Sequence, residues 1–216
     1  MKYLKTYKQI NEGLRDKMVG VSDEEIEKII KRKSPDELVS LGIKNKMDDV
    51  IKKGLDLGGR PEENEKISHL IGWGHLDIVN RLIEYEEVDL VDALEITVQK
   101  GHLDLLKKLF EKIYERPHKY KKRGHPLQFG RELRVNLVKD DLIATAAFYG
   151  QLDVIKYLLE DKDVDPGAIE NKALVWAMDG KNYDVVKYLL KDERVISKLD
   201  QLHPDRIERL KRKNLI

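Results

Sequence analysis

An all-α array of stacked helix pairs is the architecture that this 216-residue sequence indicates. Three observations point to it. The stretch GHLDIVNRLIE at 74–84 returns almost unchanged as GHLDLLKKLFE at 101–111. Weaker copies follow at 150–160 and 181–191, and a fainter one surrounds Asp49. Apolar residues recur at helical spacing in and before each copy, a combination typical of helical repeat proteins.

The second helix of each repeat follows a marker aspartate. Apolar residues stand one, two, five and six places after it, with Gly54 as the exception, while Lys and Arg occupy much of the opposite face. This spacing predicts an amphipathic helix with one buried face. The markers are Asp49, Asp77, Asp104, Asp153 and Asp184.

The first helix of each repeat ends at a position that we call the hinge. Glycine fills it in three repeats, and glycine takes a left-handed backbone without strain. Apolar or small residues stand seven, four and three places before it, which predicts a second buried helical face. Stacked neighbours must cover both faces, because one helix pair cannot bury them alone. The hinge residues are Lys46, Gly74, Gly101, Gly150 and Lys181.

Two segments, AAFYGQLDVIKYLLE at 146–160 and AMDGKNYDVVKYLLK at 177–191, resemble ankyrin repeats, and so do the two GHLD copies. The resemblance extends from about Ser34 to Lys198, although no copy has the TPLH opening of that family. It implies an ankyrin-type solenoid of about five helix pairs with capping helices. It also implies a protein-binding module, acting as adaptor, inhibitor or effector through a concave face.

The domain organisation follows from the intervals between markers, which are 28, 27, 49 and 31 residues. The interval of 49 is too long for one repeat and too short for two, so it predicts an insertion, and its prolines and glycines favour a loop. We expect a leader and capping helix at 1–33, repeats 1–3 at 34–113, the basic insertion at 114–137, repeats 4 and 5 at 138–199, and a basic capping helix at 200–216.

Composition limits the classes of function. Lys and Arg number 41 against 40 Asp and Glu, a net charge of +1, which argues against a protein built wholly around nucleic acid or an anionic membrane. The absence of cysteine excludes disulfides, thiolate zinc sites and a cysteine nucleophile. There is no apolar run of membrane-spanning length and no apolar stretch of a secretion signal. From these absences we expect a cytoplasmic monomer, of a cell or of an infected host. The N-terminal stretch MKYLKTYKQINEGLRDKM is similar to leader segments of phage-encoded proteins.

No catalytic or metal-binding pattern stands out. His75 and His102 follow hinge glycines, where a structural role in the turn is expected, and they lie a full repeat apart, too far for one metal ion. GWG at 72–74 has no strand before it, and EYEEVD at 84–89 is typical of a solvated helix end. We therefore expect no enzyme activity, no cofactor and no metal.

The resemblance also implies a binding site. In ankyrin repeats the two residues before the hinge look into the concave groove, and aromatic residues there are candidates for interface hot spots. The competing interpretation is that aromatic side chains at a helix end only pack on their neighbours. The predicted partner-binding residues are Trp73, Gln99, Lys100, Phe148, Tyr149, Trp176 and Asp179.

An alternative function rests on the basic insertion, whose cations alternate with Tyr114, Tyr120 and Phe129. Such a segment could follow a phosphate backbone and stack on bases, so nucleic acid or another polyanion is the alternative partner. A solvated loop without a ligand is the simpler interpretation. The cations concerned are Arg116, Lys119, Lys121, Lys122, Arg123 and Arg131.

Overall fold

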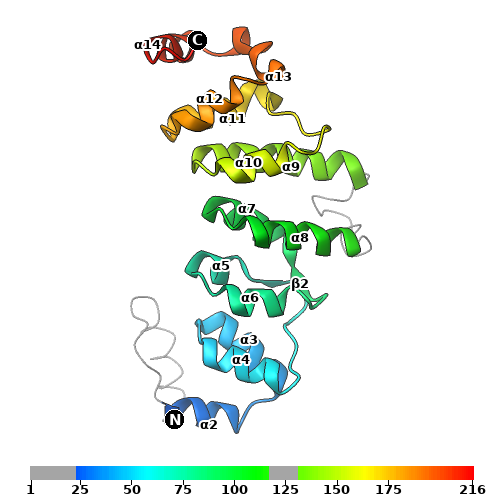
Figure 1. The fold of residues 1–216 in the computed structure, drawn as a ribbon. Helices are drawn as coiled ribbons and strands as arrows, with labels where there is room; N and C mark the ends of the chain where they lie inside the picture. Colours follow the sequence, from blue (N-terminus) through cyan, green and yellow to red (C-terminus); the bar gives the residue numbers. More distant parts are fainter. Residues whose placement is uncertain (1–22, 117–130) are drawn as a thin grey trace. The chain divides into compact units, whose positions relative to one another are not determined.

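The structure is a computed structural model that describes residues 23–116 and 131–216. The chain divides into two compact units, residues 1–90 and 91–216, and each is described by itself. Within both units, helices follow one another in pairs that are joined by tight turns (Figure 1).

Unit 1 contains two helix pairs and a preceding helix. Its helices are α2 (Asp23–Ile30), α3 (Pro35–Asn45), α4 (Asp48–Asp56), α5 (Ser68–Trp73) and α6 (Leu76–Leu82). Ser34 caps α3 in a capping box, because its side chain accepts from the backbone N–H of Glu37 while the Glu37 carboxylate accepts from the Ser34 N–H. The short strands β1 (Glu65–Lys66) and β2 (Val88–Asp89) pair in parallel and join the loops that follow α4 and α6.

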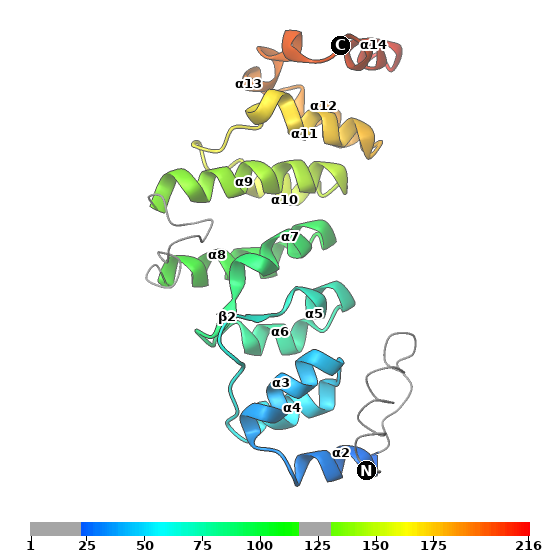
Figure 2. The ribbon, with the colours of Figure 1, turned by 180° about the vertical axis from the view of Figure 1, so that it is seen from behind.

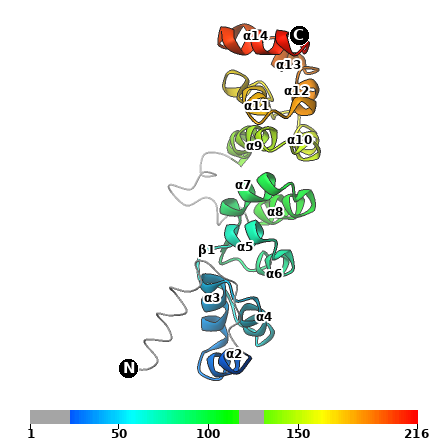
Figure 3. The ribbon, with the colours of Figure 1, turned by 90° about the vertical axis from the view of Figure 1, so that its left-hand side faces the viewer.

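Unit 2 contains three helix pairs and a closing segment. The pairs are α7 (Leu90–Lys100) with α8 (Leu103–Glu115), α9 (Arg131–Phe148) with α10 (Leu152–Leu158), and α11 (Ala168–Asp179) with α12 (Tyr183–Leu189). The closing segment has α13 (Glu193–Ile196), the 3-10 helix η2 (Leu199–Gln201) and α14 (Pro204–Arg212). Figure 3 shows α7, α9 and α11 in one layer, with α8, α10 and α12 in the other. Seen from behind in Figure 2, the loop from α10 to α11 lies at the end of the helices opposite the hinge.

The predicted helical faces form the core of both units. Every position seven, four or three places before a hinge is buried, and so is every position one, two or five places after a marker. Six places after the marker, Leu159 and Leu190 are half-buried and the others are buried. The exception at Gly54 has a steric reason: a Cβ there would lie 2.9 Å from the backbone nitrogen of Val39, so α4 can approach α3 only without a side chain. The all-α repeat fold is confirmed.

All five hinges adopt the left-handed conformation, including the two lysines. The backbone φ is 86° at Gly74, 71° at Gly101 and 72° at Gly150, and it is 61° at both Lys46 and Lys181. In each repeat the N–H after the hinge donates to the carbonyl five residues earlier, over 2.8–3.0 Å. This is the Schellman closure of a helix C-terminus, and it is kept where lysine replaces glycine.

Helix extends into both sides of the segment predicted as a loop, 114–137. Helix α8 continues to Glu115, and α9 already begins at Arg131. All prolines and glycines of the segment lie between these helices, at Pro117, Gly124, Pro126 and Gly130, so the composition that favours a loop is confined to 117–130. Residues 117–130 lie outside the described residues.

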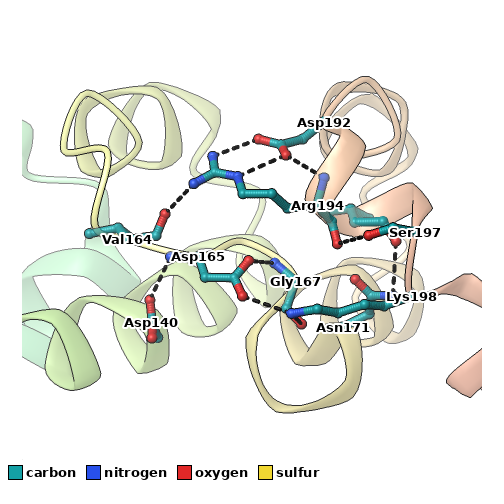
Figure 4. Close-up of polar contacts among 10 residues, drawn as sticks. Asp140, Val164, Asp165, Gly167, Asn171, Asp192, Arg194, Ser197 and Lys198 are labelled. Carbon is teal, nitrogen blue, oxygen red and sulfur yellow. Dashed lines mark hydrogen bonds and ion pairs between the residues drawn. The ribbon is translucent and has the colours of Figure 1, made fainter.

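The loop between α10 and α11 is held by a polar cluster in unit 2 (Figure 4). Asp165 accepts from the N–H of Gly167 at 2.8 Å and pairs with Nζ of Lys198 at 2.8 Å, while its own N–H donates to Asp140 at 3.1 Å. Arg194 pairs with Asp192 and donates to the carbonyl of Val164 at 2.8 Å.

Burial has a marked effect on one member of this cluster. It raises the pKa of the Asp140 carboxyl to about 6, and the nearby Asp165 and Asp141 carboxylates act in the same direction, against the N–H that Asp165 donates. The cluster therefore joins repeats 4 and 5 through a carboxyl whose pKa is raised to about 6.

Candidate functional site

The predicted partner-binding residues lie at or near the C-terminal ends of the first helices, and the structure divides them between the two units. Trp73 is at the end of α5 in unit 1. The others belong to α7, α9 and α11 of unit 2 or directly follow them. The site in each unit is therefore built separately.

Trp73 is 41% exposed and is surrounded by side chains of its own unit. Nζ of Lys46 lies 3.8 Å from the centroid of its ring, a cation–π distance. The rings of His69 and His75 meet its edge with centroid distances of 5.0 and 6.2 Å. Trp73 thus packs within unit 1, as the competing interpretation of these aromatic residues expects.

The two histidines beside Trp73 connect helix pairs. Nδ1 of His75 lies 2.7 Å from the carboxylate of Asp48, and Nε2 of His69 lies 3.1 Å from the carbonyl of Ile43. Burial raises the pKa of the Asp48 carboxyl, with His75 and Lys52 acting against it. His75 therefore joins the turn of repeat 2 to the start of α4 in repeat 1.

In unit 2, three exposed aromatic side chains form a cluster around Phe148. Phe148, Tyr149 and Trp176 are 41%, 45% and 36% exposed, and we call them the aromatic trio. The ring of Phe148 lies 5.1 Å from that of Tyr149 and 6.1 Å from that of Trp176, both edge-on. The trio spans the ends of two successive first helices, α9 and α11, and it leaves much more aromatic surface in solvent than the single Trp73 does.

One side of the trio carries an ion pair. Nζ of Lys172 lies 4.9 Å from the Trp176 ring centroid and 2.6 Å from a carboxylate oxygen of Asp141. Because Asp141 is on α9 and Lys172 is on α11, this pair links the two first helices beside the Trp176 ring.

Side-chain amides hold the hinges of unit 2 in register. Nε2 of Gln151 donates to the carbonyl of Gln99 at 3.1 Å, and Nδ2 of Asn182 donates to the carbonyls of Ala147 and Phe148 at 3.0 and 2.7 Å. Each amide directly follows a hinge and reaches the preceding repeat. A polar side chain at this position was visible in the sequence of repeats 2 to 5, so these bridges could have been expected from it.

Asp179 is engaged within the chain. Arg206 and Arg209 of α14 both pair with its carboxylate, and the hydrogen bond from Arg206 lowers the pKa of that carboxyl. Arg209 also donates to the carbonyl of Met178. A partner could reach Asp179 only beside or in place of α14, whereas Gln99 is half-exposed and Lys100 is exposed.

The structure gives little support to the residues that are predicted to bind a polyanion. Arg116 is only 6% exposed, so its buried side chain is a poor contact for a phosphate backbone. Lys119, Lys121, Lys122 and Arg123 lie outside the described residues, and Arg131 is placed only as the first residue of α9.

The part of the chain that the structure describes gives no support to a metal site or to a membrane-spanning helix. In residues 23–116 and 131–216, no three or more His, Asp or Glu side chains are grouped so that they could hold a metal ion. No helix in these ranges has the length and apolarity needed to cross a bilayer.

Stacked helix pairs, a repeated left-handed hinge and matching buried faces define a helical repeat protein. The family model of ankyrin repeats matches residues 127–200 in three copies, a range that includes α9 through α13. Residues 127–200 are therefore ankyrin repeats. Ankyrin repeats are in general modules of protein–protein interaction and typically lack enzymatic activity. Comparisons with curated proteins and with solved structures gave no match.

Proposed function

We propose that this protein binds a partner protein through the ends of the first helices of unit 2, with the aromatic trio as the central contact. The observation that carries the proposal is the exposure of Phe148, Tyr149 and Trp176, between 36% and 45%, at adjoining helix ends of a protein-interaction module. Exposed aromatic clusters are costly in water and are favoured at interface hot spots. We propose a non-catalytic role as adaptor, inhibitor or effector, exerted by a cytoplasmic monomer.

The structure favours the trio over Trp73 as the contact. Trp73 already has a cation on its face and two rings at its edge, so a partner would gain less from it. The trio has neighbours only on part of its surface. Gln99 and Lys100 belong to the same row of helix ends, one repeat before Phe148 and Tyr149.

The proposal is tested by affinity capture from cells of the source with three immobilised proteins. These are the unaltered chain, the double variant Phe148→Ala with Trp176→Ala, and the control Ile196→Ala. Ile196 is 47% exposed on α13, so its truncation also removes exposed apolar surface but outside the trio. A partner should be retained by the first and the third protein, and the double variant should weaken its binding by about 1 kcal/mol or more.

Melting curves accompany the capture experiment. The substitutions remove surface contacts, so each should change the free energy of unfolding by only about half a kcal/mol. If all three proteins retain the same partners equally, the aromatic trio is not the binding surface.

Among the cations of the insertion, the structure describes the side chain of Arg116 alone, and its burial does not favour the alternative of polyanion binding. It predicts a steep loss of nucleic-acid affinity with rising salt, because phosphate contacts release counterions. A salt titration with a labelled oligonucleotide separates this alternative from protein binding.

A further inference from the structure

We infer that the partner segment that docks on the aromatic trio is acidic and carries an apolar anchor side chain. This inference rests on the proposed function and adds the chemistry of the partner. It is carried by two exposed lysines that flank the trio, Lys100 and Lys181, together with the arginine pair of α14.

Lys181 is held beside the trio by its backbone. It is the hinge residue of repeat 5, fixed at φ 61°. Its two chain neighbours both adjoin Phe148: the Asn182 amide donates to the Phe148 carbonyl at 2.7 Å, and a Cβ on Gly180 would lie 2.2 Å from that oxygen. The backbone of Lys181 therefore lies beside the helix end that carries Phe148 and Tyr149.

Lys100 occupies the corresponding place on the other side. It precedes the hinge of repeat 3 as Tyr149 precedes the hinge of repeat 4. The Gln151 amide connects these two hinges through its 3.1 Å hydrogen bond to the Gln99 carbonyl. Lys100 and Lys181 are both exposed, and neither pairs with an acidic group of the described residues. Along the row of helix ends, the trio is thus bracketed by two cations.

The arginines of α14 extend this positive character. Arg206 and Arg209 share the single carboxylate of Asp179, so this group carries one excess positive charge beside α11. Nζ of Lys213 lies 5.2 Å from the ring of Tyr183, close to the same hinge.

The acidic groups near the trio are paired or belong to the other layer. Asp141 is neutralised by Lys172 at 2.6 Å. Asp104, Asp153 and Asp184 are the second residues of α8, α10 and α12. These helices form the layer opposite α7, α9 and α11 (Figure 3). On the layer of the first helices, the hinge end therefore offers apolar rings between cations.

This arrangement suits a segment with carboxylates on either side of an apolar residue. The apolar side chain would cover the trio, and Glu or Asp would reach the two lysines. Charge complementarity of this kind accelerates association, opposes partners of the wrong sign and makes binding sensitive to salt. A basic segment would instead place like charges together.

Three labelled peptides of one design test the inference by fluorescence anisotropy with the full chain. They share Leu and Phe at helical spacing and differ in carrying Glu, Lys or Gln at all other positions. We expect the Glu peptide to bind at least about tenfold more tightly than the Lys peptide, and to lose affinity as salt rises. Phe148→Ala with Trp176→Ala should weaken this binding by about tenfold or more.

Charge reversal tests the two lysines directly. Lys100→Glu with Lys181→Glu should weaken the Glu peptide by about tenfold or more and strengthen the Lys peptide. Lys187→Glu is the matched control, since Lys187 is exposed on α12, in the other layer, and its reversal should leave the affinity unchanged. Circular dichroism melting of each variant shows whether it remains folded.

The outcomes separate the inference from the function on which it rests. Tighter trio-dependent binding of the Lys or Gln peptide would overturn an acidic partner and leave the binding surface in place. An unchanged affinity in the double lysine variant would also overturn it, as would no binding of any peptide. Concentration-dependent self-association through the trio, or oligonucleotide binding through the two lysines, would assign another occupant. The proposed function is tested separately, and it fails if partner capture is unchanged when the aromatic trio is substituted.

Discussion

The left-handed hinges predict that replacing a lysine by glycine stabilises this protein. Lys181 holds φ at 61°, in a region that costs a residue with a Cβ about 1–2 kcal/mol. Glycine removes this strain but gives the unfolded chain more freedom, which costs about 0.4–1 kcal/mol. The Lys181 side chain is exposed and makes no hydrogen bond or ion pair with a described residue, so nothing else is lost. Lys181→Gly should therefore raise the free energy of unfolding by about 0.5–1 kcal/mol.

Lys46 provides a matched comparison. It has the same φ of 61°, but its ammonium group lies 3.8 Å from the Trp73 ring centroid. Losing that cation–π contact costs about 0.5–1 kcal/mol at an exposed site, so Lys46→Gly should be close to neutral. The difference between the two lysine variants measures the contact with Trp73.

The reverse substitutions test the same reasoning with opposite sign. At Gly74 an added Cβ would meet no atom within 4 Å, so Gly74→Ala should lose only the conformational preference, about 0.5–1 kcal/mol. At Gly150 the Cβ would lie 2.9 Å from Oδ1 of Asn182, the side chain that bridges repeats 4 and 5. Gly150→Ala should therefore cost about 1 kcal/mol more than Gly74→Ala, because the amide bridge must move.

Urea unfolding followed by circular dichroism measures all four variants, and thermal unfolding should shift by about 2–4 °C for each kcal/mol. The expected order of stability places Lys181→Gly above the unaltered chain, Lys46→Gly near it, and Gly150→Ala last. If Lys181→Gly is destabilising by 1 kcal/mol or more, the reasoning is refuted, and the lysine side chain must contribute more than its backbone costs.

Three further predictions use the same measurements. Leu158→Ala should lose about 2–5 kcal/mol, because Leu158 is 1% exposed between stacked pairs, and a loss below 1 kcal/mol would contradict this packing. Asp140 has a pKa raised to about 6, so its contribution to stability is present below pH 4 and is lost as pH rises through 6. Asp140→Asn should therefore gain stability over the unaltered chain at pH 7 but not at pH 4, whereas equal effects at both would exclude the titration. Trp73→Ala should lower stability by about 1 kcal/mol and leave trio-dependent binding intact, and the reverse result would restore Trp73 to the binding surface.

The helical faces could be predicted from sequence because burial follows a simple period. Within each unit the helix pairs pack on one another, so the same positions are buried in successive repeats. The left-handed backbone of the lysine hinges does not follow from residue preference, since a lysine does not prefer that region. Lys181 keeps the turn because the closing hydrogen bonds remain: the N–H of Asn182 reaches the Ala177 carbonyl at 2.9 Å.

The boundaries of the insertion could not be placed from composition. Prolines and glycines mark where a helix cannot continue, but they do not mark how far the flanking helices extend toward them. RELRVNLV at 131–138 contains none of them and is helical from Arg131. The burial of Arg116 could not be predicted from the sequence either, because a cation beside a basic run is expected to be solvated.

The end of the array shows why Asp179 differs from the other predicted contacts. In repeat 4 the carbonyl of Ala147, three places before the hinge, accepts from the amide of Asn182 in the next repeat. Repeat 5 has no further repeat of this type after it in the described chain, and its corresponding carbonyl, Met178, accepts instead from Arg209. Because Arg209 and Arg206 also pair with Asp179, α14 satisfies the last first-helix end with cations, which suit a helix C-terminus. The repeat pattern alone places Asp179 among the partner-binding residues. The structure pairs it instead with Arg206 and Arg209 of α14, a helix that lies outside the repeat.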